Sequence, residues 1–274
     1  MNLFHIATMK KRFRIGFGLL LVGAVGGVAW LALRPGEPMY KGKRLSVWLK
    51  VYDSAAGYKP YSPARQKEAD DAIRSIGTNA IPTLLRRIRA KDSASTLWLV
   101  SLAEKQRVFK VKFRYAWILH VEGKNGFRAL GAGGKDAVPE LIRIFEQDHS
   151  TESREDVAEV LNRIGSAAEL AVPALVLSLG DTKSHYRVPV IQALREIHAR
   201  PEIVLPAMVK CASDQNTDVR VQAILTMGAF GSDSRQAVPD LVKLLSDSNY
   251  YIRDVAKAVL LGIDPEAAAK MGLK

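Results

Sequence analysis

The sequence predicts an all-α fold: a right-handed α-solenoid of stacked helix pairs, preceded by one N-terminal transmembrane helix. The first reason is a repeat, because Pro173, Pro206 and Pro239 lie 33 residues apart. Two further columns keep that period: Arg154, Arg187, Arg220 and Arg253, and Asp181, Asp214 and Asp247. Such a period is typical of two-helix units that bury a continuous core only by packing on their neighbours. The second reason is a run of nineteen uncharged residues, 15–33.

Residues 15–33 are long enough to cross a bilayer. At ~1.5 Å per residue the run extends about 28 Å, close to the ~30 Å of the hydrocarbon layer. A basic tail, residues 1–14, precedes it, and Trp30 lies near its far end as an interfacial anchor. We predict an uncleaved signal anchor. Cleavage after Ala29 is the alternative, because Gly27 and Ala29 form a small-x-small pattern.

The orientation of this anchor follows from its flanks. Basic residues stand on both sides of the run, so the positive-inside bias is nearly balanced by count. We favour the short tail inside, because its charges lie closer to the apolar run. This places the repeat domain in the periplasm of a bacterial-type inner membrane.

Residues 34–64 are predicted to be a juxtamembrane linker and an N-terminal cap. Pro35-Gly36-Glu37-Pro38 does not suit a helix interior. An amphipathic stretch follows at 45–49, with Leu45 and Trp48 among its apolar residues. Solenoid ends need a cap, because the first repeat otherwise exposes its stacking face.

Residues 65–274 are predicted to be the repeat domain. Its first unit covers 66–91, where Gly77 ends one helix and Pro82 starts the next. From 135 to 264 the units are regular, each with a helix, a Gly or His loop, a proline and a second helix. The segment 92–133 is irregular, because Pro82 and Pro139 are 57 residues apart. Part of it alternates with strand period, but we predict one long irregular helical unit there.

The regular units resemble the HEAT repeat family, in particular its short, phycobilisome-lyase type. The residues that carry the resemblance are Asp218-Val219-Arg220, Ala223, Leu225, Gly228, Gly231, Ala237-Val238-Pro239, Leu241, Leu244-Leu245 and Asp247. The chain is also similar to membrane-anchored bacterial repeat proteins, through Tyr40, Gly42, Lys43, Leu45, Trp48 and Leu49. The resemblance implies an all-α superhelix with a binding role and leaves the ligand open.

One repeat departs from the pattern. His198 stands where the neighbouring units have a loop glycine. Pro189 is predicted to fall inside that unit's first helix, where it would remove a hydrogen bond and kink the turn. The lone cysteine, Cys211, lies among apolar residues and is predicted to be a buried core thiol.

The net charge of +12 is unevenly distributed. Residues 1–50 and 51–133 each carry +8, whereas 134–274 carry −4. A nucleic-acid-binding solenoid would carry a basic stripe along its repeats, so nucleic acid is unfavoured and a membrane surface is favoured. The candidate surface for an anionic membrane or an acidic partner is basic: Arg86, Arg87, Arg89, Lys91, Lys105, Arg107, Lys110, Lys112 and Arg114.

Aromatic side chains alternate with part of this basic segment. Trp98, Phe113 and Trp117 are among them. They could anchor a protein partner, but we expect them to fill the core of the irregular unit.

The Asp and Arg columns also form pairs six residues apart. They are Asp181 with Arg187, Asp214 with Arg220, and Asp247 with Arg253. We predict a structural ladder of inter-repeat ion pairs rather than an anion-binding track.

The sequence indicates no catalytic, cofactor-binding or metal-binding residues. The five histidines contain no pair four apart, and neither an adjacent His-Glu pair nor a phosphate loop is present. We therefore expect a non-enzymatic scaffold that is tethered to the membrane and binds an unknown protein through its solenoid surface, with no small-molecule substrate evident. The alternatives are a lyase-like or enzyme-accessory protein that handles a chromophore, and a nucleic-acid or anionic-lipid binder through residues 86–114.

Overall fold

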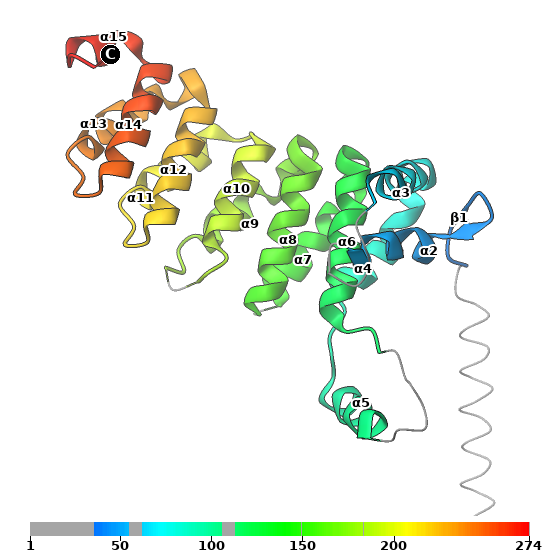
Figure 1. The fold of residues 1–274 in the computed structure, drawn as a ribbon. Coiled ribbons are helices and arrows are strands. Elements are labelled where there is room, and N and C mark those ends of the chain that lie inside the picture. The colour runs from blue at the N-terminus through cyan, green and yellow to red at the C-terminus, as the bar shows by residue number, and fades with distance from the viewer. Residues whose placement is uncertain (1–35, 55–61, 106–112, 149, 183, 274) are drawn as a thin grey trace, which may run out of the picture. The chain divides into compact units, whose positions relative to one another are not determined.

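The computed structural model describes residues 36–54, 62–105, 113–148, 150–182 and 184–273. The chain divides into two compact units, Met1–Glu37 and Pro38–Lys274. The predicted tail and transmembrane segment, residues 1–33, lie outside the described residues. The second unit is built almost entirely of helices where it is described, as Figure 1 shows.

Helix pairs follow one another along this second unit. The first helices of the pairs are α3 (Pro63–Ile76), α6 (Ala116–Leu130), α8 (Thr151–Ile164), α10 (Arg187–Ile197), α12 (Thr217–Ala229) and α14 (Tyr250–Ile263). The second helices are α4 (Ile81–Ile88), α7 (Val138–Gln147), α9 (Val172–Ser178), α11 (Pro201–Cys211), α13 (Val238–Leu244) and the closing α15 (Pro265–Lys270).

A common turn joins the two helices of most pairs. It is a short 3-10 helix: η2 (Gly77–Ala80), η3 (Gly131–Ala137), η4 (Gly165–Ala171) and η5 (Gly231–Ala237). Each turn begins with a glycine whose φ lies between +52° and +68°, a conformation that glycine adopts without a Cβ penalty. A proline then occupies the first turn of the second helix, where its missing amide would have no partner.

The pair α10–α11 solves the same problem differently. His198 takes a left-handed conformation (φ 51°) in the place of the loop glycine, and Arg200 does so too (φ 57°). The predicted kink at Pro189 is wrong: α10 begins at Arg187, so Pro189 lies in the first turn, where amides have no intrahelical acceptor. The proline inside a helix is instead Pro206, because α11 begins at Pro201.

The pairs are held together by one continuous apolar core that runs from Leu45 to Ile263. Successive first helices pack on one another, from α6 through α8, α10 and α12 to α14. Each second helix also packs on the first helix that follows it, as α7 does on α8. The prediction of an all-α stack is confirmed for the described residues, and Cys211 is buried in it as predicted.

The N-terminal cap docks as predicted. It consists of a small hairpin, β1 (Met39–Tyr40) with β2 (Lys43–Arg44), followed by α2 (Leu45–Leu49) and η1 (Lys50–Ser54). Leu45, Trp48 and Leu49 are buried against α3 and α6. The hairpin itself was not predicted, although its turn residues were expected to form a turn.

The segment 92–133 does not form one irregular helical unit. It contains α5 (Ala94–Lys105) and then α6, which begins a regular pair with η3 and α7. The 57-residue spacing therefore reflects an insertion of 24 residues in the turn between α4 and α6. Proline spacing alone could not tell an inserted helix from an irregular repeat.

In the described part of the chain, the stretch Thr151–Ser178 is long and apolar enough to cross a membrane. It comprises α8, η4 and α9, and Gly165 with its φ of 68° breaks the helix between them. Its apolar residues belong to the core of the stack.

Two glycines allow α6 to approach α4 closely. A Cβ on Gly123 would lie 2.9 Å from Ile88 Cδ1, and one on Gly126 would collide with Leu84 and lie 3.2 Å from Leu49 Cδ2. Such distances are shorter than carbon atoms tolerate in a packed core. The contact between cap, α4 and α6 thus requires glycine at these positions.

Replacing Gly126 with alanine should lower the thermal unfolding midpoint of the full chain in detergent. Overpacking a core costs ~1–3 kcal/mol, more than the ~1 kcal/mol that alanine gains over glycine in a helix. The control is Gly262→Ala in α14, where nothing lies within 4 Å. It should leave the midpoint unchanged or raise it, as circular dichroism would show. Equal shifts in both variants would contradict the close contact.

Candidate interaction surfaces

The turns that follow the second helices lie along one edge of the stack, here called the turn edge (residues 148–150, 181–186, 213–216 and 246–249). Each turn holds one aspartate of the periodic column or its counterpart Asp148. The carboxylates of Asp148, Asp214 and Asp247 accept backbone hydrogen bonds from Ser150, Asn216 and Asn249 at 2.8–3.1 Å. These bonds shape the start of the next first helix.

The arginine column ties these turns together, with a pairing that differs from the predicted one. Arg187 forms an ion pair with Asp214, and Arg220 Nε lies 3.8 Å from Asp247 Oδ2. The partners are 27 residues apart, not six. Each arginine reaches from a first helix to the turn that closes its own unit.

The six-residue relation exists through the backbone. Arg220 donates to the Asp214 carbonyl at 2.8 Å, and Arg253 to the Asp247 carbonyl at 2.7 Å. Arg220 therefore joins the turn before its helix to the turn after its unit. Arg187 is only 5 % exposed, and burial next to a carboxylate suits a structural ion pair better than an open anion track.

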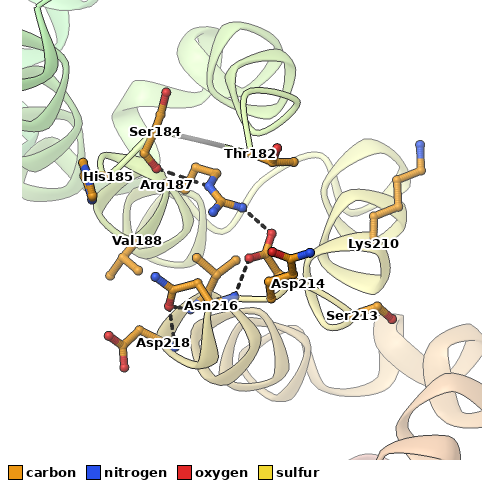
Figure 2. A pocket seen from close by; sticks show the side chains of 12 residues that line it. Thr182, Ser184, His185, Arg187, Val188, Lys210, Ser213, Asp214, Asn216 and Asp218 are labelled. Carbon is orange, nitrogen blue, oxygen red and sulfur yellow. Dashed lines mark hydrogen bonds and ion pairs between the residues drawn. The ribbon is translucent and has the colours of Figure 1, made fainter.

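An open pocket of about 860 Å³ lies between two of these turns. Figure 2 shows the Arg187–Asp214 pair inside it, with Lys210 and Asp218 near its rim. Ser184 accepts from Arg187 Nε at 3.2 Å through its carbonyl. The charged groups at the centre are already bonded to one another. The pocket can therefore offer rim hydrogen bonds to a polar partner but holds no group arranged for catalysis.

The structure divides the predicted basic surface. The side chain of Lys105 and residues 107, 110 and 112 lie outside the description. Among the described members, Arg89 pairs with Glu140, and Lys91 Nζ lies 2.7 Å from Asp148 Oδ2. These two pairs link α4 and its following turn to α7. The predicted binding of an anionic surface or acidic partner stays a prediction.

Arg87 and Arg114 serve a buried acid that the sequence analysis missed. Glu122 on α6 has no exposed surface; Arg87 Nε lies 3.3 Å from it and Arg114 donates to it. Arg114 also lies 3.1 Å from Asp53 in η1. Burial raises the pKa of Glu122, and the arginines oppose that rise. Its position four residues after buried Ile118, on the same helix face, was the available signal.

A second overlooked feature is a row on the second helices. Four residues after each periodic proline, one side chain of the second helix is exposed. The members of this second-helix row are Arg86, Arg143, Leu177, Lys210 and Lys243. Four of the five are cationic, and Leu177 is 81 % exposed. Arg143 and Lys243 form only exposed pairs with Glu140 and Asp240 on their own helices.

A cluster of titratable groups joins α6 to α8. His120 Nδ1 lies 2.8 Å from Asp156 Oδ2, and its Nε2 lies 2.8 Å from the Ala90 carbonyl. Lys124 Nζ lies 2.8 Å from Asp156 Oδ1. Among the described residues no group of three or more His, Cys, Asp or Glu side chains could hold a metal ion. The cluster therefore acts as a link between helices.

Comparison with known families agrees with this architecture. Residues 172–261, from α9 into α14, match the profile of HEAT repeats. HEAT repeats generally act as protein-interaction scaffolds. No curated protein matches the chain. The lyase-type and membrane-anchored features of the predicted resemblance go beyond this match.

The link at His120 should make stability depend on pH. The hydrogen bond to Asp156 raises the pKa of His120, although burial opposes the rise. The stabilisation is therefore complete below the unfolded-state pKa of ~6.5 and is lost as pH rises through the folded-state pKa. Urea unfolding of the full chain and of His120→Gln should show a free-energy difference that shrinks above pH ~6.5. A difference that is constant or grows with pH would contradict this link.

Proposed function

We propose that this protein is a non-enzymatic scaffold that binds a protein partner through its second-helix row. The observation that carries the proposal is the row itself: one exposed side chain per unit, repeated at the same position along the stack. A partner that follows the row meets cationic groups on either side of the exposed Leu177. The complementary partner carries acidic side chains flanking an apolar anchor.

The energetics of the row suit an interface. The ion pairs of Arg143 and Lys243 are solvent-exposed, and exposed pairs contribute little, so a partner's carboxylates can replace Glu140 and Asp240. A fully exposed leucine gains by burial in a partner's pocket. Regular spacing along stacked units also matches extended segments better than a compact ligand.

The proposal includes a membrane tether. It rests on the uncharged run 15–33 and its basic flanks. In the proposed orientation the short tail stays in the cytoplasm, and the helix pairs work in the periplasm. The scaffold would then gather its partner at the membrane surface.

Reversing two charges of the row should weaken partner binding. With a photo-crosslinking amino acid in place of Leu177, the full chain should give a discrete crosslinked product in cells. The double variant Arg143→Glu, Lys210→Glu should reduce that product about tenfold or more, because like charges across an interface repel strongly. The yield would be measured by immunoblotting.

A matched reversal tests whether the effect belongs to the row. Arg163→Glu changes an equally exposed arginine on α8, a first helix. It should leave the Leu177 crosslink intact. Loss of the crosslink in both variants, or in neither, would argue against the second-helix row as the binding surface.

The tether is tested by topology. Alkaline phosphatase, which is active only outside the cytoplasm, should be active when fused after Lys274. A fluorescent protein that requires the cytoplasm should stay dark at the same position. A silent phosphatase with a bright fluorescent fusion would reverse the orientation and bring the nucleic-acid reading of residues 86–114 forward.

A further inference from the structure

The inserted helix α5 lies apart from the stacked helix pairs, as Figure 1 shows. Its apolar side chains are in solvent: Trp98 is 63 % exposed and Leu99 is 57 % exposed, with Leu97 and Leu102 also exposed. The expectation that Trp98 fills the core of this region is therefore wrong. Trp117, at the start of α6, is exposed as well.

The base of the insertion is fixed to the stack. Asp92 Oδ1 accepts a hydrogen bond at 3.0 Å from the Ala116 amide, at the first residue of α6. The two ends of the insertion are thus held together where the other units have a tight turn. This arrangement presents α5 at the turn edge as a closed excursion, not as a loosened repeat.

The apolar residues of α5 do not form a stripe. At ~100° per residue, positions 97, 98, 99 and 102 spread over more than half of the helix circumference. A helix that docks in a protein groove keeps a polar face toward water. A helix that is apolar all round is typical of one surrounded by an apolar medium.

The few polar groups of α5 are bonded locally. Ser93 caps the helix by accepting from the Thr96 amide at 3.1 Å, and its hydroxyl lies 2.6 Å from the Thr96 hydroxyl. The Ser101 hydroxyl donates to the Trp98 carbonyl at 2.8 Å. Residues 93–103 carry no charge. Transfer into hydrocarbon would therefore leave few unsatisfied groups, which are the main barrier to insertion.

Length and charge point to one leaflet. Twelve residues extend about 18 Å at ~1.5 Å each, too short for the ~30 Å of a bilayer core. Arg86, Arg89 and Lys91 stand at the base of the insertion, where they can meet anionic headgroups. A tryptophan in the helix suits the interfacial layer.

We propose that α5 inserts into one leaflet of an anionic lipid bilayer, as a second membrane contact beside the predicted anchor. The apolar side chains enter the acyl boundary, and the basic residues at the base remain among the headgroups. This contact fixes the turn edge of the stack at the bilayer surface. It depends on no residue of the second-helix row, so the two proposals fail separately.

The test measures depth at α5, because residues 15–33 would by themselves bring the chain to vesicles. The full chain, with Cys211→Ala and Ser101→Cys, carries an environment-sensitive fluorophore at position 101. It is reconstituted in vesicles of phosphatidylcholine and phosphatidylglycerol. The control carries the label at Ser248→Cys, an exposed position on the turn edge in the last regular unit. Brominated lipids and aqueous iodide serve as quenchers.

Insertion predicts a blue shift at position 101, quenching by brominated lipid and protection from iodide, with the opposite pattern at position 248. Adding Trp98→Glu and Leu99→Glu should abolish lipid quenching at 101 without changing the helical circular dichroism. Iodide quenching at 101 equal to that at 248 would overturn the proposal. Protection from both quenchers would also overturn it and would assign α5 to a second copy or a protein partner.

Discussion

The structure depends on one constraint: an isolated helix pair cannot bury its own apolar face. The buried side chains form a single cluster from the cap to α14, so each pair completes the core of its neighbour. The two ends therefore need special elements. At the N-terminal end α2 and η1 cover α3 and α6, and at the C-terminal end α15 packs on α14. Close approach at Gly126 shows how tightly the cap end is fitted.

Polar groups add register to this apolar stack. The Arg187–Asp214 and Arg220–Asp247 pairs connect first helices to turns, and Glu122 connects α6 to α4 and η1. Buried ion pairs contribute little net stability, because desolvation offsets their attraction, but breaking one leaves an unpaired charge. The ladder therefore penalises any shift of one unit against the next.

The sequence predicted what local chemistry determines. A glycine with positive φ and a proline in the first turn of a helix are local requirements, so helix boundaries from Gly77 to Pro239 could be read from residue types. The ladder residues were also found, but not their partners. Choosing spacing 27 over spacing 6 requires knowing that successive turns share an edge. Glu122 broke an apolar stripe and was detectable, whereas the exposure of α5 was not, since periodicity does not show whether a helix is stacked or inserted.

The insertion is informative because the rest of the chain obeys its repeat so closely. Each other turn after a second helix is short and ends in an aspartate that caps the next helix. At the α4–α6 turn the same cap persists, from Asp92 to Ala116, while 24 additional residues are accommodated without disturbing the packing of α4 on α6. An apolar helix in such a loop gains nothing for the core and lowers solubility in water. Its presence is explained if its environment is not water. That reasoning separates two surfaces of the stack: the turn edge, which carries α5, and the second-helix row, which offers charges to a partner.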